Sequence, residues 1–241
     1  GVSKANSSVD YAMLEYCIRE DLKLKKARLM AVLDPVKLVI DNYPEGQMED
    51  LEIPMNLENP ELGSRIVPFG KELYIEREDF MEVRPSKYFR LYPGNEVRLM
   101  GAYFVTCTGC EKGENGNVTV VHCTYDPETK GGSSQDGRKV KGTIHWVAAE
   151  TAVKAECRLY ENIVDEEKGK LDENGNLNLN PNSLVILEEC YVEPELAKAK
   201  AFDSFQFVRN GYFCADCKDS KPEHLVFNRI VSLKSSFKIA K

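Results

Sequence analysis

The 241-residue chain lacks the short motifs that mark most enzyme classes. It contains no GxSxG, no GxGxxG, no GxxxxGK[ST] and no HExxH, which excludes the common signatures of hydrolases, dinucleotide sites, phosphate loops and zinc peptidases. It has only three histidines, and two of them, His122 and His145, stand inside patterns typical of strands. Neighbouring carboxylates such as Glu188 and Glu189 point to opposite faces of a strand, which does not suit a shared acid-base site. We therefore expect this chain alone to be catalytically inactive.

Long apolar runs and sequence repeats are also missing. No run approaches the roughly 18 residues of a membrane span, and the opening GVSKANSSVD lacks the basic-then-apolar order of a secretory signal. We therefore expect a cytoplasmic protein without a membrane partner and without disulfides. No repeat of about 20–50 residues is visible, which argues against a propeller or a solenoid. Its 42% hydrophobic and 29% charged residues are typical of a globular protein.

Positive charge is scarce overall but is segregated along the chain. The net charge of −7 argues, taken alone, against a nucleic-acid partner. Residues 41–61 contain seven acids and no base, whereas residues 84–100 carry four bases and one acid, and residues 229–241 four bases and no acid. A basic face on an acidic body can hold a polyanion. The alternative interpretation is that these runs are ordinary solvated faces.

Eight cysteines include two pairs with metal-like spacing, Cys107 with Cys110 and Cys214 with Cys217. A four-cysteine zinc site is one interpretation. However, 103 residues separate the two pairs, whereas a zinc ribbon has a gap of about 15–20. We expect no metal site and interpret Cys107 as a small hydrophobic residue on a strand.

The apolar pattern predicts one helix followed by many short strands. Ser7 and Asp10 suggest a capping box, and apolar residues recur at helical spacing as far as Lys26. The later apolar stretches are short and rich in Val, Ile, Tyr and Phe, which predicts strands at 36–40, 71–76, 96–105, 117–125, 141–148, 153–160, 183–192, 204–208 and 225–233. Asn-Gly pairs at 115–116 and 174–175 predict type I′ hairpin turns. Many strands with turn signals indicate a sandwich or a barrel.

Two segments interleave basic and aromatic residues, as single-stranded RNA sites do. Residues 84–99 combine Arg and Lys with Tyr and Phe, and residues 204–213 combine Gln206 and Arg209 with four aromatics. Aromatic rings stack unpaired bases, while Arg and Gln read their edges. The same alternation is also found in any half-buried strand.

Longer runs resemble one known family. These are CIREDL (17–22), RLMAVLDPVKLVIDNYPEG (28–46), GSRIVPFGKELYIEREDF (63–80), KYFRLYPGNEVRL (87–99), CTYDPET (123–129), DGRKVKGTIHWV (136–147) and FQFVRNGYF (205–213). They resemble the C-terminal anticodon-binding region of bacterial glutaminyl-tRNA synthetases. Enzymes of that family use ATP and Mg in a separate catalytic domain with HIGH-like and KMSKS-like motifs, and neither motif occurs here. The resemblance implies part of a longer enzyme, with no cofactor in this chain.

The resemblance also implies a fold. It predicts a mainly β chain with two closed β-barrels, the second inserted in the first, preceded by a short helical segment. The implied division is the end of a helical subdomain at 1–26, a proximal barrel at 27–84 plus 185–241, and a distal barrel at 85–184. Because closed barrels expose no sheet edges, we expect a monomer.

Functional positions carry over from the family one by one. The middle anticodon base, a uridine, is held in the family by residues that match Arg28, Gln206 and Arg209. The third base, a guanine, is read by the residue that matches Arg90, whose guanidinium can donate to O6 and N7 together. The implied partners are glutamine tRNA and the catalytic domain of the same polypeptide.

The first anticodon base is where this chain departs from the family. Of the family's basic contacts only Arg98 is retained, since the other two positions are Phe89 and Met100. Lys87 stands where the family has Gln and can still donate to a phosphate or a base. Ser236, before an aromatic residue near the C-terminus, is compatible with the family's polar residue there.

Two alternatives remain open from the sequence. One is the C-terminal part of a glutamyl-tRNA synthetase of the archaeal and eukaryotic type, whose barrels are related. The FQF-R element together with Arg28 favours the glutamine enzyme. The other is a stand-alone RNA-binding or metal-binding β-module.

Overall fold

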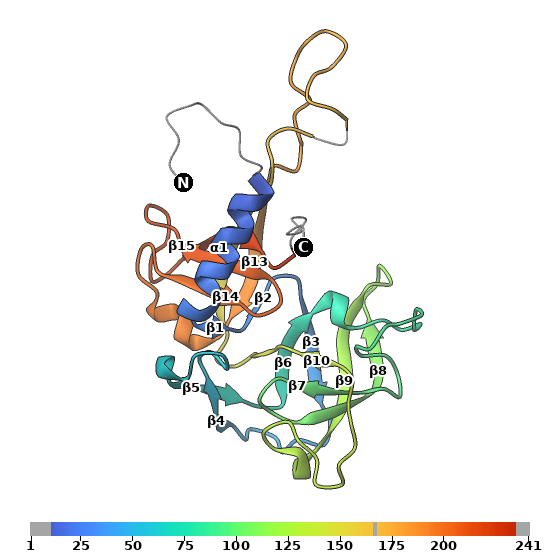
Figure 1. Ribbon diagram of the computed structural model, residues 1–241. Coiled ribbons are helices and arrows are strands. Elements are labelled where there is room, and N and C mark those ends of the chain that lie inside the picture. The colour runs from blue at the N-terminus through green and yellow to red at the C-terminus, as the bar shows by residue number, and fades with distance from the viewer. Residues whose placement is uncertain (1–10, 166–167, 235–241) are drawn as a thin grey trace.

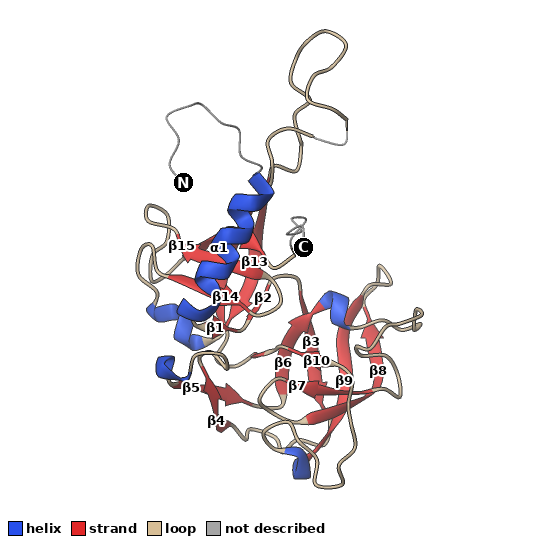
Figure 2. Cartoon of the chain, viewed as in Figure 1, coloured by secondary structure: helices blue, strands red, loops and turns tan. Residues whose placement is uncertain are grey.

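The computed structural model describes residues 11–165 and 168–234, which form one α-helix and two barrel-like sheets (Figures 1 and 2). The elements are α1 (Tyr11–Lys25), β1 (Arg28–Leu29), β2 (Ala31–Val32), β3 (Pro35–Ile40), β4 (Glu49–Pro54), β5 (Ser64–Phe69), β6 (Glu72–Glu76), β7 (Glu96–Leu99), β8 (Phe104–Lys112), β9 (Val118–Asp126), β10 (Thr143–Ile144), β11 (Val147–Ala148), β12 (Val153–Tyr160), β13 (Leu184–Val192), β14 (Ser204–Phe207), β15 (Gly211–Ala215) and β16 (Leu225–Ser232). Short 3-10 turns cover Pro60–Leu62, Arg77–Asp79, Pro127–Thr129 and Pro194–Lys198. The prediction of a mainly β chain with two barrels is confirmed.

The predicted helix is present as α1, and its C-terminal end is capped by side chains. Asn56 Nδ2 donates to the carbonyl oxygens of Lys23 and Lys26, each at 3.0 Å, and Asn59 Nδ2 donates to that of Leu24 at 2.8 Å. These bonds satisfy carbonyls that a helix end leaves without partners. The suggested capping box at Ser7 lies outside the described residues. Among the residues that are described, no helix is both long and apolar enough to cross a membrane.

Each seven-stranded sheet begins and ends with strands that follow each other in the sequence. The upper sheet in Figure 1 has the order β1-β14-β15-β16-β12-β13-β2, and Met30 alone separates β1 from β2. The lower sheet has the order β10-β7-β8-β9-β3-β6-β11, and His145 with Trp146 separates β10 from β11. One stretch of backbone therefore joins the two ends of each sheet, which leaves little exposed strand edge. β4 and β5 form a separate pair.

The division between the two sheets differs from the expected boundaries. β3 and β6, expected in the proximal barrel, pair with β9 and β11 of the lower sheet. β12, expected in the distal barrel, pairs with β13 and β16 of the upper sheet. The lower sheet is still inserted in the upper one, but the chain crosses after Val32 and returns before Val153. The parallel pairs β3-β9 and β12-β16 assign these strands to the other sheet. Such pairing joins strands that are far apart in the chain, so the local sequence pattern does not reveal it.

Residues 29–32 run between the two hydrophobic cores. Leu29 and Ala31 are buried in the core of the upper sheet, whereas Met30 and Val32 are buried in the core of the lower sheet. Successive side chains of an extended segment point to opposite sides, so one short segment serves both cores. Residues 29–32 therefore connect the two cores directly, and we call the region where the two sheets meet the junction.

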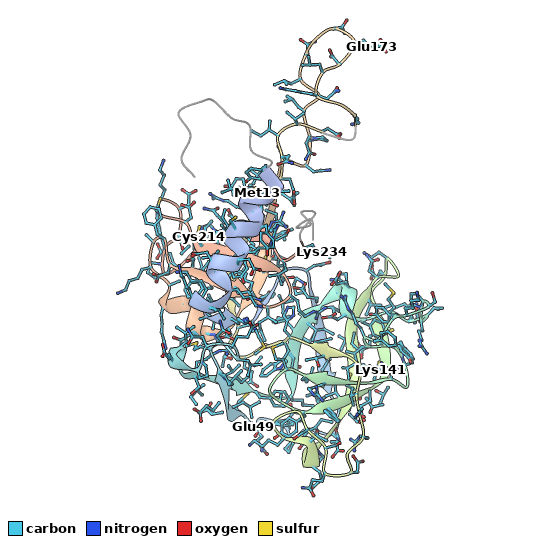
Figure 3. The ribbon with its side chains drawn as sticks, in the orientation of Figure 1. Met13, Glu49, Lys141, Glu173, Cys214 and Lys234 are labelled. Carbon is cyan, nitrogen blue, oxygen red and sulfur yellow. The ribbon has the colours of Figure 1, made fainter. Side chains whose placement is uncertain are left out.

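Two turns lie where the sequence predicts them, and a third interrupts a predicted strand. Gly116 has a φ of 79° in the turn between β8 and β9, where the Asn-Gly pair predicts a hairpin, but Asn115 has no positive φ, so the turn is not of type I′. Gly175 has a φ of 80° in the segment 168–183, which projects from the upper sheet with Glu173 near its tip (Figure 3). The single strand predicted at 96–105 is two strands, because Gly101 turns the chain at a φ of 68°.

Candidate nucleic-acid interface

Three of the predicted site residues line one cavity of about 510 Å³, which we call the arginine cavity. Lys87 and Arg90 come from the segment between the lower sheet's β6 and β7, and Arg209 comes from the turn between β14 and β15 of the upper sheet. Lys141, labelled in Figure 3, adds a fourth cationic side chain beside β10. The cavity thus collects positive charge from both sheets, and Glu78 is the acid in its lining.

Behind the cavity wall, the two arginines share the buried carboxylate of Asp79. Arg209 donates through Nη1 and Nη2 to the two oxygens of Asp79, both at 2.6 Å. Arg90 Nε lies 3.2 Å from Asp79 Oδ1, and Arg90 Nη1 donates to Glu78 Oε1 at 2.7 Å. Burial by itself lowers the pKa of Arg209. The hydrogen bonds to Asp79 and the charges of the nearby carboxylates together have a larger, opposite effect, so the pKa of Arg209 is raised overall. Arg209 therefore stays charged.

The backbone of the arginine cavity is held in unusual conformations. Lys87 and Arg209 have φ angles of 62° and 67°, in the left-handed region that non-glycine residues rarely adopt. At Gly142, a Cβ atom would lie 2.0 Å from the carbonyl oxygen of Phe89, so only glycine allows the two segments to approach this closely. Such conformations persist where the surrounding structure fixes them, and they are frequent at binding sites.

A second cavity of about 300 Å³ continues the arginine cavity and is rich in aromatic rings. Tyr88, Phe89, Lys141 and Gly142 line both cavities. Phe89 is 44% exposed, and Lys141 Nζ lies 5.2 Å from the centre of its ring. The second cavity adds the side chains of Arg84, Tyr92 and Lys139. Exposed rings beside cations are what stacking of unpaired bases requires.

The sequence reasoning did not select Lys139 and Lys141. Both stand in the run RKVKG at 138–142, which resembles a solvated basic loop. The feature of the sequence that could have identified them is the cluster of three basic residues at 138–141, next to the strand predicted at 141–148. It becomes informative only when β10 places the run beside β7 and the 84–92 segment.

Arg28 and Gln206 form a second group, on neighbouring strands of the upper sheet. They are directly opposite each other in the parallel pair β1-β14, and Tyr212 is opposite Gln206 on β15. Arg28 Nη2 donates to Glu58 Oε1 at 2.6 Å and lies 3.5 Å from the Lys23 carbonyl at the end of α1. Arg28 therefore contacts the helix end, while its main partner is an exposed carboxylate.

Arg98 and Met100 lie apart from the arginine cavity. The guanidinium of Arg98 lies 5.2 Å from the ring centre of Phe104, its partner across β7 and β8. Met100 packs against the core of the lower sheet and offers no donor. Ser236 lies outside the described residues. Of the predicted contacts, the structure thus brings together Lys87, Arg90 and Arg209, and separately Arg28 with Gln206.

The two cysteine pairs lie in different sheets. Cys107 and Cys110 are on β8 of the lower sheet, and Cys107 is opposite Cys123 on β9. Cys214 is on β15 of the upper sheet (Figure 3), and Cys217 follows it. Among the described residues, no group of three or more His, Cys, Asp or Glu could hold a metal ion.

A larger cavity, of about 650 Å³, lies beside the stacked rings of Tyr74 and Tyr191. Its lining contains two cations, and both are ion-paired: Lys37 with Glu72 at 2.8 Å and Arg77 with Asp34 at 3.2 Å. The arginine cavity contains four cations, and among the described residues no carboxylate pairs with its Lys87 or Lys141. The larger cavity therefore fits a polyanion less well than the arginine cavity does.

Two family models and several curated proteins match this chain. Residues 27–126 and 143–216 match two family models, both described as tRNA synthetases class I (E and Q), anti-codon binding domain. The chain is 54% identical over 241 residues to a glutamine-tRNA ligase from Clostridium kluyveri, covering 99% of this chain and 43% of that protein. It is 56% identical to the enzyme of the same name from Clostridium perfringens, covering 99% and 43%.

A more distant relative gives the same result. A glutamine-tRNA ligase from Vibrio cholerae is 52% identical over 237 residues, covering 98% of this chain and 42% of that protein. The chain thus spans less than half the length of the relatives it matches, and it corresponds to their C-terminal region. It belongs to the anticodon-binding family of the class I tRNA synthetases for glutamate and glutamine.

Proposed function

We propose that this chain binds the anticodon of glutamine tRNA as part of a glutamine-tRNA ligase. The observation that supports this most strongly is the arginine cavity, where Lys87, Arg90 and Arg209 meet beside the exposed ring of Phe89. The cations attract the phosphates of the loop, and the rings stack its unpaired bases. The names of the relatives favour glutamine over glutamate as the amino acid.

Each base has its own group of side chains. Arg90 donates to O6 and N7 of the guanine at the third position. The middle uridine is bound by Arg209 of the arginine cavity and by the separate group of Arg28 and Gln206 on β1 and β14. Lys87 and Arg98 remain for the first base and the adjacent phosphates.

Aminoacylation itself belongs to the rest of the polypeptide. ATP, Mg and glutamine bind in a catalytic domain outside this chain, and this chain contributes the selection of the tRNA. The parent enzyme acts as a monomer in the cytoplasm. Purified residues 1–241 should therefore show no glutamine-dependent exchange of pyrophosphate into ATP.

Binding to synthetic RNA stem-loops tests the proposed function. A stem-loop with a seven-nucleotide loop carrying the anticodon CUG is compared with one whose anticodon is replaced by AAA. We expect the CUG loop to bind at least about tenfold more tightly, since each mismatch typically costs about 1–3 kcal/mol. The affinity should fall as salt increases, because phosphate contacts release counterions. Equal affinities for the two loops would contradict the proposal.

A further inference from the structure

Asp79 is the only carboxylate among the described residues that contacts both Arg90 and Arg209 while being completely buried. It ends the 3-10 turn Arg77–Asp79, and its backbone oxygen accepts a hydrogen bond from Leu91 N at 2.9 Å. This bond joins Asp79 to Leu91, the residue that follows Arg90. A buried carboxylate is stable only when it is paired, so both arginines are held to it.

One carboxylate with two guanidinium partners makes their positions interdependent. Asp79 Oδ1 receives Arg209 Nη2 at 2.6 Å and also lies 3.2 Å from Arg90 Nε. A displacement of either arginine changes the electrostatic environment of the other through this shared oxygen. Arg209 has little freedom to compensate, because its backbone is in the left-handed region and His145 Nδ1 lies 3.5 Å from its Nη1.

Glu78 provides a contrast within the same turn. Its side chain is 69% exposed and contacts Arg90 Nη1 at 2.7 Å and Arg209 Nη2 at 3.7 Å. Because it faces solvent, water can replace it at little cost. Glu78 touches the same two arginines as Asp79 but lacks the burial that fixes their positions, so the arrangement of the two arginines depends mainly on Asp79.

We propose that Asp79 is a positioning residue that couples recognition of the middle anticodon base with recognition of the third. The inference rests on the proposed function, in which Arg209 binds the middle uridine and Arg90 the third guanine. Asp79 touches neither base. It holds the two guanidinium groups in one arrangement, so that a wrong base at one position also disturbs the arginine that reads the other.

The test is a cycle of four stem-loops measured with the 241-residue chain. The anticodons are CUG, CUA, CCG and CCA, which change the third base, the middle base, or both. For the unsubstituted chain we expect the loss of affinity for CCA to differ at least about fivefold from the product of the two single losses, because groups that share a partner are not additive. Simple multiplication of the two losses would overturn the proposal.

The same cycle is then measured with Asp79→Asn and with the control variant Asp219→Asn. We expect Asp79→Asn to reduce discrimination at both bases about tenfold and to make the two losses multiply, because small misplacements of positioned groups are costly. Asp219→Asn should retain the discrimination and the coupling, because it removes an exposed carboxylate that pairs with Arg158 outside both cavities. A folded Asp79→Asn protein that retains both would overturn the proposal. If even the unsubstituted chain does not discriminate among these loops, the proposed function itself has failed.

A second variant keeps the proposal testable if Asp79→Asn does not fold. Arg90→Lys retains a positive charge but cannot place Nε against Asp79 while a second nitrogen faces the base. We expect the coupling between the two bases to disappear in Arg90→Lys, while discrimination at the middle base is retained. Persistent coupling in this variant would mean that Asp79 does not transmit it.

Discussion

Arg209 and Asp79 connect the two barrel-like sheets through two hydrogen bonds of 2.6 Å each. Arg209 lies in the turn after β14 of the upper sheet, and Asp79 lies three residues after β6 of the lower sheet. The arginine cavity is therefore assembled at the junction between the sheets. The geometry of the cavity therefore depends on the contacts that fix the two sheets relative to each other.

A buried ion pair also holds the junction, and removing one partner should destabilise the fold. Arg65 of β5 donates through Nε and Nη2 to Glu193, which follows β13, at 2.7 and 2.9 Å. Arg65→Met leaves the Glu193 carboxylate buried without its cation, so we expect a loss of about 3–5 kcal/mol in the free energy of unfolding. Denaturant unfolding measures this loss.

The matched control for this prediction is Lys154→Met. Lys154 pairs with Glu189 at 3.0 Å on the surface, and an exposed pair contributes about 0–1 kcal/mol. If Arg65→Met and Lys154→Met had equal effects, the buried pair would not hold the junction.

Lys141 should contribute affinity without base specificity. Its ammonium group lies over the ring of Phe89 and lines both cavities, where it can contact the phosphate backbone. We expect Lys141→Ala to weaken all anticodon stem-loops by a similar factor and to reduce the slope of log affinity against log salt by about one. Lys71→Ala, which removes a lysine paired with Glu45, is the control and should leave the slope unchanged. A base-dependent effect of Lys141→Ala would assign it a role in reading sequence.

Discrimination at the first anticodon base should be poor. Phe89 offers a stacking face that any base can use, Met100 packs into the core, and Arg98 lies beside Phe104. Glutamine codons end in A or G, so both C and U must be accepted at this base. We expect stem-loops with CUG and UUG anticodons to bind within about tenfold of each other, or roughly 1.4 kcal/mol. A clear preference beyond that limit would point to an additional donor such as Lys87.

His122 should make the stability of the lower sheet depend on pH. Its Nδ1 lies 2.8 Å from Asp41 Oδ1 and its Nε2 lies 3.0 Å from Glu111 Oε1. The hydrogen bond to Asp41 is the main cause that raises the pKa of His122, and Glu111 adds to it against the effect of burial. A raised pKa in the folded state stabilises the protein below the unfolded value of about 6.5, and this stabilisation is lost as pH rises through the folded value.

Thermal unfolding of His122→Gln checks this dependence. The difference in melting temperature between the unsubstituted chain and His122→Gln should be largest at about pH 5.5 and should shrink toward about pH 9, a range of about 3.5 units that brackets the transition. A difference that does not change with pH would show that the two carboxylates do not stabilise the charged imidazole.

Local sequence patterns predicted the strands with continuous Val and Ile runs, and missed those whose burial depends on distant partners. β3 and β9 are recognisable from the sequence alone, and the Asn115-Gly116 pair gives the turn before β9. β4 and β5 were not predicted, because acids and prolines interrupt their alternation, although Leu51 and Val67 are buried. Their structure depends on pairing with each other, which the local pattern does not reveal.

The sequence identified some residues of the arginine cavity, but it could not identify the contacts between them. The resemblance to the synthetase family selected Arg90 and Arg209, which lie more than one hundred residues apart in the sequence. It did not indicate that both contact Asp79, because a single acid after a strand has no distinguishing pattern. Lys141 was missed because it stands in a run of basic residues, and such a run is usually an ordinary solvated loop.

The most direct test of the account is recognition of the third anticodon base by Arg90. Affinities of the unsubstituted chain and of Arg90→Ala are measured for four stem-loops that differ only in that base. We predict that the unsubstituted chain prefers guanine and that Arg90→Ala loses about 1–3 kcal/mol of this preference, while its affinity for the other three bases changes little. An equal loss of affinity for all four bases would contradict the account, because it would show that Arg90 contacts a phosphate and does not read the base.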